Sequence, residues 1–520
     1  MPRGEVKVSI DPPVFGLRSD LPRHLVPDGF LVSGKNVICR DGAIVTRSGL
    51  TRVTTTAPTS NRVMGAVYYK DHTDTKRLII GTTAGFHVYT GGATWADAPA
   101  SGLLNGGAGN QVRFTVFMLA GTTRVVAVND VDVPQSWTGT GDFAALGGSP
   151  PIAKCVTSAF QRVILGNITV GGTRRGSTMA ISGFQDPASW NSADQPSLPD
   201  TGDSIMEVRA LNAQTFAIYK DKSQWVGIGA GEIFPFIFEL RDQQPGPASP
   251  GSVVQAGTDH FYIGQDGDVY RFDGSRCRPI GSVIRRTIQS DVDWALVGRM
   301  HGFFDRRNRE VWWFWPPASG TGTSGVVYRL PYGDVPGAFS PLLSFTQILT
   351  VSADWDELGS VTWNDLTGTW DGIGSTYPTW DSFGGTARPG GVIARSNGQV
   401  YRSGDAGSDD GSTFDTEWEL PLRAVAGAGE NVRVDAIESF FKQEVSTVNA
   451  EVILVTTDTL GTAGTQVAAQ TVDLSTGTRL RATYADQQAR FVGVKYRILG
   501  TVGGKEYRGG TIYAWKRGES

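Results

Sequence analysis

Short hydrophobic runs separated by turns rich in glycine and aspartate recur along most of the chain. Each unit has a run of β-branched or aromatic residues, a polar turn, and a second run that carries an aromatic residue. The units begin at Arg77, Arg124, Arg162, Thr215, His260, Arg309 and Gly391. Successive starts are 38 to 53 residues apart, except for the last interval of 82. Such runs predict short strands, and the turns between them predict hairpins.

The spacing of these units predicts how the strands assemble. A strand-based period of roughly 40 to 50 residues is the signature of a β-propeller. A single hairpin cannot bury both of its faces, whereas stacked blades of four strands can. We therefore predict an all-β protein with a β-propeller of about six to seven blades. One large β-sandwich, or several sandwiches, would also produce short strands and many turns, and it stays open as the alternative.

The pattern changes at both ends of the chain. Residues 1–60 begin with a proline-rich stretch that predicts an extended arm, followed by a hairpin around Asp41 and Gly42. From residue 406 onward the strands are longer and alternate more regularly, as in VRVDAIESFF and AEVILVTTD. We therefore predict an N-terminal arm and β-hairpin over 1–60, a propeller over 61–405, and a C-terminal antiparallel β domain over 406–520.

One helix is predicted within the propeller. The stretch from Ser282 to Trp294 places Ile284, Ile288 and Val292 four residues apart. This spacing puts the three side chains on one helical face, and Ser282 could serve as the N-cap. The helix would bridge two blades.

The long last interval contains an insertion over 355–385 with four tryptophans. Each of them, Trp355, Trp363, Trp370 and Trp380, is followed directly by Asp or Asn, among glycines, serines and threonines. Their spacing is too short to mark blades. We favour a compact loop in which buried indoles and Asp-to-backbone hydrogen bonds replace a larger core. The alternative is a glycan-binding surface on which Trp363, Trp370 and Trp380 stack against sugar rings.

Composition and charge exclude several functions. The net charge is −4 and 19% of the residues are charged, so the basic excess of a protein that grips nucleic acid phosphates is absent. A weakly acidic surface would instead let DNA slide past.

The three cysteines, Cys39, Cys155 and Cys277, are odd in number and far apart. They predict buried free thiols rather than a disulfide framework.

Motifs for catalysis or metal binding are missing from the sequence. The five histidines form no HExxH pair, and no GxSxG elbow is present, so we expect turn or surface histidines and no enzyme, cofactor or metal site. Asp405, Asp409, Asp410 and Asp415 could surround a calcium ion, but they lack the DxDxDG spacing. An aspartate-rich turn is the favoured interpretation. We also expect neither a cleavable signal nor a membrane-spanning segment.

Three stretches together resemble a known family. They are FGLRSDLPRHLVPDGFLVSGKNVICRDGAIVTRSGLTRV from Phe15, FFDRRNREVWWFWP from Phe303, and GQVYRSGDAGSDDGSTFDTEWELP from Gly398. Along with the Trp-Asp series, they are similar to the tail nozzle (tail tubular protein B-like) proteins of short-tailed bacteriophages. The resemblance covers most of the chain and rests on the general character of these stretches rather than on one diagnostic motif.

The resemblance implies a structural virion protein without catalytic residues. It would form a homo-hexameric ring below the portal and adaptor proteins and extend the DNA ejection channel without sequence-specific binding. The ring would support fibres or spikes, sit in the virion tail, and assemble in the host cytoplasm. The alternative function is a receptor-binding tail protein: a propeller that binds or degrades glycans.

Overall fold

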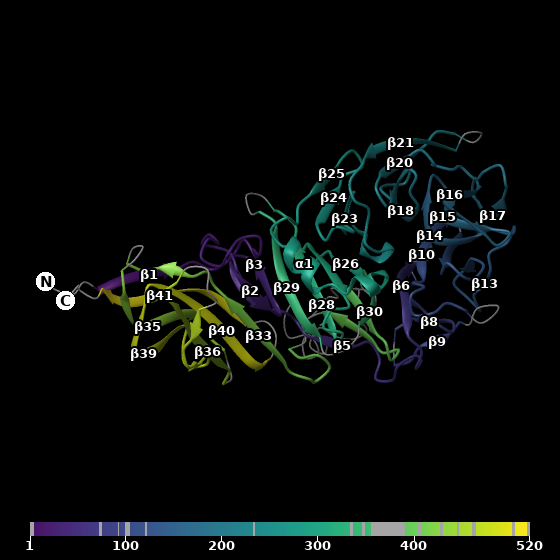
Figure 1. Ribbon diagram of the computed structural model, residues 1–520. Helices are drawn as coiled ribbons and strands as arrows, with labels where there is room; N and C mark the ends of the chain where they lie inside the picture. Colours follow the sequence, from purple (N-terminus) through teal and green to yellow (C-terminus); the bar gives the residue numbers. More distant parts are fainter. Residues whose placement is uncertain are drawn as a thin grey trace, which may run out of the picture.

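Seven four-stranded antiparallel sheets form a β-propeller, at the upper end of the predicted six to seven blades (Figure 1). The computed structural model describes residues 5–516 apart from 72–74, 92, 99–103, 120–121, 232–234, 333–335, 346–348, 355–390, 404–406, 427–429, 445–446, 460–463 and 502–504. The first strands of neighbouring blades contact one another, as β14 contacts β18 and β30 contacts β6. These first strands therefore surround the propeller axis.

The first four blades follow one another along the chain. Blade one contains β6 (Val63–Lys70), β7 (Lys76–Thr82), β8 (Phe86–Tyr89) and β9 (Ala96–Asp97). Blade two contains β10 (Arg113–Leu119), β11 (Thr122–Val128), β12 (Gln135–Trp137) and β13 (Ala144–Ala145). Blade three contains β14 (Ile152–Ala159), β15 (Arg162–Val170), β16 (Thr173–Gly183) and β17 (Asp186–Trp190). Blade four contains β18 (Ile205–Ala210), β19 (Thr215–Lys220), β20 (Gln224–Gly229) and β21 (Phe236–Asp242).

The last three blades include the short helices and a strand from the N-terminal segment. Blade five contains β22 (Val254–Ala256), β23 (Asp259–Ile263), β24 (Val269–Phe272) and β25 (Cys277–Pro279). Blade six contains β26 (His301–Asp305), β27 (Glu310–Trp315), β28 (Thr323–Arg329) and β29 (Ala338–Phe345). Blade seven contains β30 (Leu349–Asp354), β31 (Gly391–Arg395), β32 (Val400–Ser403) and, as its outer strand, β5 (Leu50–Arg52). The wheel is thus closed by pairing two distant parts of the chain.

The predicted helix is present but shorter than expected. Helix α1 covers Arg285–Asp291, between 3-10 helices η1 (Pro250–Ser252) and η2 (Trp294–Arg299) in chain order. Ile284 occupies the N-cap position without a side-chain cap bond, so Ser282 does not cap the helix. The predicted apolar stripe is correct, because Ile284, Ile288 and Val292 are all buried. α1 joins the last strand of blade five to the first strand of blade six.

The remaining strands form two sheets packed face to face beyond blade six (Figure 1). One contains β1 (Glu5–Ile10), β3 (Val37–Arg40), β4 (Ala43–Thr46), β35 (Val432–Phe441), β39 (Arg479–Ala489) and β41 (Glu506–Lys516). The other contains β2 (Ser33–Lys35), β33 (Phe414–Glu419), β34 (Arg423–Ala424), β36 (Asn449–Thr457), β37 (Thr465–Gln466), β38 (Gln470–Asp473) and β40 (Phe491–Thr501). Tyr496 of β40 lies against Tyr507 of β41 across the interface between the sheets, with ring centroids 4.7 Å apart. We refer to this unit as the sandwich.

The N-terminal segment is shared between the two parts of the molecule. Strands β1 to β4 pair within the sandwich, whereas β5 belongs to the propeller. The predicted hairpin at Asp41 and Gly42 joins β3 to β4, and both turn residues have positive φ. Before β2, the chain lies against blade six, where Leu17 N–H donates to the Phe339 carbonyl at 2.7 Å. Residues 1–60 thus supply strands to three sheets instead of forming a separate arm.

Apolar packing continues from the propeller into the sandwich. One buried cluster contains Phe261 and Trp313 from the blades and Cys39, Trp418 and Tyr496 from the sandwich. Strand β29 contacts β2 and β3, so blade six supplies the surface on which the sandwich packs. The two parts share a single core at this joint. Burial of apolar surface is the dominant favourable term in folding, so this core stabilises their attachment.

The predicted free thiols are confirmed. Cys39, Cys155 and Cys277 form no disulfide bond, and all three are buried. Burial raises the pKa of the Cys39 thiol to about 12, and it raises that of Cys277 by a similar amount. A thiol kept protonated in this way is a poor nucleophile and a poor metal ligand, so the three residues serve as small core side chains.

Candidate functional site

A cavity of about 240 Å³ lies at one end of the propeller axis. It is lined by residues at or just before the starts of first strands, including Arg113 of β10, Lys154 of β14, Met206 of β18 and Pro250 before β22. Gly298, just before β26, completes this set. Because blades two to six each contribute, the cavity marks the end of the axis where the first strands begin. We call this region the channel mouth.

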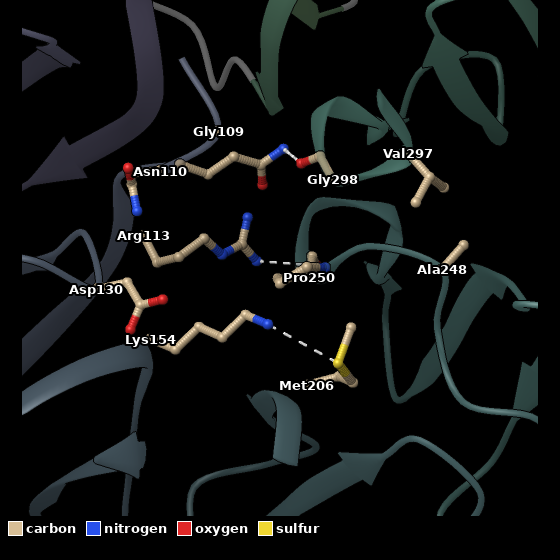
Figure 2. Close-up of a pocket in the computed structure, with 11 residues that line it drawn as sticks. Gly109, Asn110, Arg113, Asp130, Lys154, Met206, Ala248, Pro250, Val297 and Gly298 are labelled. Atoms are coloured by element: carbon tan, nitrogen blue, oxygen red, sulfur yellow. Dashed lines mark hydrogen bonds between the residues drawn. The ribbon is translucent and has the colours of Figure 1, made fainter. Parts of the chain in front are cut away.

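Side chains reach across the channel mouth from one wall to the other (Figure 2). Gln111 Nε2 donates to the carbonyl oxygen of Gly298 at 2.9 Å, which connects blade two with the turn before blade six. Arg113 Nη2 approaches the carbonyl oxygen of Pro250 at 3.4 Å. The axis of the wheel is therefore crossed by side chains at this end and is no open tube.

Two carboxylates near the cavity are neutralised by arginine. Glu207 is only 1% exposed, and its Oε2 lies 2.7 Å from Arg113 Nη2. Burial raises the pKa of the Glu207 carboxyl, and the Arg113 charge opposes that rise. Asp130 lines the cavity but forms an ion pair with Arg174. Neither acid leaves an uncompensated negative charge in the channel mouth.

Lys154 is the cation of the cavity wall that lacks a carboxylate partner. Its Nζ lies 3.9 Å from the thioether sulfur of Met206, and a thioether is a weak acceptor. Figure 2 shows the lysine extended across the cavity towards that sulfur. No ion pair to Lys154 occurs among the described residues. An ammonium group held in a cavity with so weak a partner is a donor available to an anion.

Further basic groups lie at the same end of the wheel. Arg299 directly follows the cavity residue Gly298, and Arg62 directly precedes β6. Burial lowers the pKa of Arg62, and the positive charge of Arg299 lowers it further. Arg62 Nε is buried and has no hydrogen-bond partner in the part of the chain that the structure describes. Like Lys154, neither arginine forms an ion pair with a described carboxylate. The channel mouth is therefore a basic region in a chain whose net charge is −4.

His301, the first residue of β26, lies beside this basic region and is only 4% exposed. Its Nδ1 lies 2.9 Å from the carbonyl oxygen of Arg299, which identifies Nδ1 as the protonated nitrogen. Nε2 has no partner among the described residues. Burial lowers the pKa of His301 to about 4, and the charge of Arg62 contributes to the shift.

The prediction of turn or surface histidines is wrong for two of the four histidines that the structure describes. His260 is fully buried, with Nδ1 2.8 Å from the Tyr219 hydroxyl and Nε2 3.0 Å from the carbonyl oxygen of Ala210. Both ring nitrogens are thereby satisfied between blades four and five. His301 is the second buried histidine. The polar character of histidine concealed both positions, although each occurs in a run of apolar and aromatic residues.

The aspartate-rich turn contacts arginines of the N-terminal segment. Asp409 forms an ion pair with Arg47, and Asp410 forms one with Arg52. Asp415 accepts a hydrogen bond at its backbone oxygen from Asn36, while Asp405 lies outside the described residues. Within the described part, no group of three His, Cys, Asp or Glu side chains is placed to hold a metal ion. These pairs make the turn a structural connection.

The tryptophans of the predicted insertion, Trp355, Trp363, Trp370 and Trp380, lie outside the described residues. The strands on either side of it pair with each other, and Asp354 of β30 lies opposite Gly391 of β31. The insertion therefore connects the first and second strands of blade seven.

A second cavity, of about 410 Å³, lies at the outer part of blade three. Its lining combines Trp190 at the end of β17 with Asn191, Ser192 and Gln195. Trp190 is half-buried, and its indole N–H donates to the carbonyl oxygen of Pro187 at 3.0 Å. We call this cavity the Trp190 groove. Sequence reasoning did not identify it, because a single tryptophan before a polar turn carries no distinctive spacing.

Comparisons with known proteins give weak structural similarities. No family model and no curated protein matches the chain. Among solved structures, the Neurospora crassa Pan2 WD40 domain matches with 10% identity and a TM-score of 0.40, covering 68% of this chain and 95% of that one. YCF48 bound to D1 peptide matches with 10% identity and a TM-score of 0.38, covering 69% and 95%. U3-55K matches with 7% identity and a TM-score of 0.35, covering 59% and 88%.

In the described part of the chain, no helix has the length and apolar character needed to span a lipid bilayer.

Proposed function

We propose that this chain is a structural protein of a bacteriophage tail, a subunit of a ring that extends the DNA ejection channel. The observation that carries the proposal is the shared N-terminal segment, which supplies β1 to β4 to the sandwich and β5 to the propeller. A unit tied together in this way transmits force between its two parts. That property suits the wall of a conduit, and the resemblance to tail nozzle proteins points to the same role.

The joint between the parts is reinforced by a buried ion pair. Arg40 of β3 donates to both carboxylate oxygens of Glu310 in β27, each at 2.9 Å. The Glu310 side chain is completely buried, and Trp312 Nε1 also donates to it at 3.2 Å. Planar bidentate pairing fixes orientation as well as distance. Relative rotation of sandwich and propeller would break these bonds inside the molecule.

The channel mouth constrains where DNA could pass. Gln111 and Arg113 cross the axis of the wheel, and the cavity there measures only about 240 Å³. A DNA duplex cannot pass through such a space. In the proposed function, DNA therefore passes between several copies of the chain, as the six-fold ring requires. The portal, the adaptor and the fibres or spikes would be neighbours of that ring.

Purified virions that carry this gene provide the test. Cryo-electron microscopy of the tail should place six copies of the sandwich-and-propeller unit around the axis, next to the portal and adaptor. Mass spectrometry of the same particles should give about six copies per tail. Virions that lack the chain, together with a protein that stays monomeric in lysate, would contradict the proposal.

A second candidate function is glycan binding, and the Trp190 groove is the observation that favours it. An indole surrounded by amide and hydroxyl side chains is a common platform for sugar rings, because it combines an apolar face with hydrogen-bond donors and acceptors. A glycan array with the wild-type protein would detect this activity.

Variants on the array locate any such site. Loss of binding in W190A would place it at the groove, whereas loss in a variant with both W370A and W380A would place it on the insertion. If the protein binds no glycan, the candidate function fails. In the ring proposal, the variants with changes in the insertion lose stability or assembly instead.

A further inference from the structure

We propose that the channel mouth binds an acidic segment of a polypeptide, with an Asp or Glu carboxylate of that segment accepting a hydrogen bond from Lys154 Nζ. The inference is independent of the proposed tail function. Lys154 extends across a cavity in which its hydrogen-bond partner among the described residues is a thioether sulfur, 3.9 Å away (Figure 2). A carboxylate oxygen would replace this weak contact with a charge-assisted hydrogen bond.

The surrounding charges favour an anion. Arg62 and Arg299 have no described carboxylate partner. Asp130, which lines the cavity, is already paired with Arg174, and Glu207 is paired with the lining residue Arg113. Lys154, Arg62 and Arg299 therefore leave a local positive excess on a protein with a net charge of −4. This excess attracts anionic groups and raises their local concentration at the mouth.

His301 lies next to this basic cluster but is not part of the cavity lining. Its Nδ1 donates to the carbonyl oxygen of Arg299 at 2.9 Å, which holds the backbone of Arg299 in place at the mouth. The groups that attract the anion are therefore the side chains of Lys154, Arg62 and Arg299.

The size and lining of the cavity indicate which kind of anion fits. The cavity volume of about 240 Å³ is below the roughly 300–1,000 Å³ typical of sites for drug-sized ligands. A single amino-acid side chain therefore fits the cavity better than a nucleotide does. The lining also includes the apolar groups of Met206, Ala248 and Val297, against which the methylene groups of Glu can pack. No aromatic ring lines the cavity, and aromatic rings are what single-stranded nucleic acid stacks on.

Binding of a defined probe tests the proposal. Fluorescence anisotropy would measure the affinity of the full chain for a labelled, capped hexaglutamate peptide, with capped hexaglutamine as the neutral counterpart. We expect binding of hexaglutamate only. The K154Q variant should weaken it by about tenfold, the effect of losing one charge-assisted hydrogen bond. The K442Q variant changes the same charge at an exposed lysine of the sandwich and should stay within about twofold of wild type.

A spectroscopic readout locates the bound peptide. The chain has six methionines, so a spectrum of ¹³C-methyl methionine is simple, and M206L identifies the Met206 signal. Hexaglutamate should shift that signal in the wild-type protein. The same spectrum of K154Q without peptide shows whether the variant is folded.

Three results would overturn the proposal. The first is absence of hexaglutamate binding by the wild-type protein. The second is equal weakening by K154Q and K442Q, or a Met206 signal that does not move on binding. The third is a ten-nucleotide oligothymidine that binds more tightly than hexaglutamate, because the mouth would then be a nucleic acid site.

Discussion

Arg47 and Asp409 form a bidentate ion pair although 362 positions separate them in the chain: Nη1 lies 2.8 Å from Oδ1, and Nη2 lies 2.5 Å from Oδ2. Arg47 is 1% exposed, and its guanidinium also lies 3.8 Å from the centre of the Phe414 ring. Asn36 Oδ1 accepts a further hydrogen bond from Nε at 2.9 Å. The pair connects the approach to β5 with the chain that enters the sandwich.

Replacing Arg47 should strongly destabilise the protein. In R47M, Asp409 and Asn36 lose their donor, and removal of one member of a buried ion pair typically costs about 3–5 kcal/mol. Denaturant unfolding followed by tryptophan fluorescence would measure the change in the free energy of unfolding.

The R52M variant is the matched control. The neighbouring Arg52–Asp410 pair is far more exposed, with Arg52 at 46%, and exposed pairs contribute about 0–1 kcal/mol. Equal losses in R47M and R52M would show that burial does not set the strength of this connection.

Gly16 should tolerate no side chain. Its φ is +84°, and a Cβ there would lie 2.3 Å from the carbonyl oxygen of Phe339. In G16A the N-terminal segment must move away from blade six, so trypsin should cut after Arg18 and Arg23 at a much higher rate. Time courses of limited proteolysis, analysed by mass spectrometry, would measure this rate.

G42A separates the steric effect from backbone strain. Gly42 has a similar φ of +79°, but no atom lies within 4 Å of the position that a Cβ would occupy. It should show only the cost of a left-handed alanine, about 1–2 kcal/mol. Unchanged proteolysis in G16A would mean that the segment does not depend on this close approach.

Acidification should destabilise the protein through His260 and His301. Burial lowers their pKa values to about 3 and about 4, whereas an unfolded histidine titrates near 6.5. Below pH 6.5 the unfolded chain therefore binds more protons than the folded chain, and stability falls as the pH is lowered towards 4. Above pH 7 neither histidine contributes to a pH dependence.

The H301F variant isolates one of the two contributions. Phenylalanine can pack against Phe314, whose ring centroid lies 5.7 Å from that of His301, and it binds no proton. Between pH 7 and pH 5, the melting temperature of H301F should fall less steeply than that of wild type. Identical slopes would show that His301 is protonated equally in the folded and unfolded states.

Residues 1–60 should act as a separable piece that restores the rest of the chain. Residues 61–520 alone lack β1 to β5, which leaves open edges at β32, β33 and β41. Open edges promote aggregation, so we expect this fragment to be insoluble. Co-expression with residues 1–60 should restore soluble protein that co-purifies with the short fragment.

A substitution in β5 tests whether the closing strand is responsible. Leu50 is 2% exposed, so L50D in the short fragment should abolish the rescue. If residues 61–520 are soluble and fully folded alone, β5 is dispensable for closing the wheel.

The repeated units could be predicted because each is local. The seven starting residues lie in or directly before the second strands of the seven blades, from Arg77 in β7 to Gly391 at the start of β31. Hairpins between consecutive strands leave their period in the sequence. The buried stripe of Ile284, Ile288 and Val292 was predicted for the same reason, since helical spacing is a local property.

The closing strand and the channel mouth could not be predicted in this way. Thr51 of β5 pairs with Arg402, and no local pattern links positions that far apart. The basic residues of the mouth come from different blades, so no spacing connects Arg62, Lys154 and Arg299. Their one shared sequence signal is a cation close to the start of a blade's first strand, and that signal becomes informative only when the strand bounds are known.

The place of β5 in blade seven has a consequence during synthesis. The ribosome makes residues 50–52 about 350 residues before it completes their partner β32, which ends at Ser403. At typical translation rates of 5–20 residues per second, the nascent chain stays unclosed for roughly 20 to 70 seconds. A ribosome that stops before this point releases an incomplete set of blades with unpaired edge strands. Because β5 precedes every other strand of the propeller, it can pair only after β32 has been made.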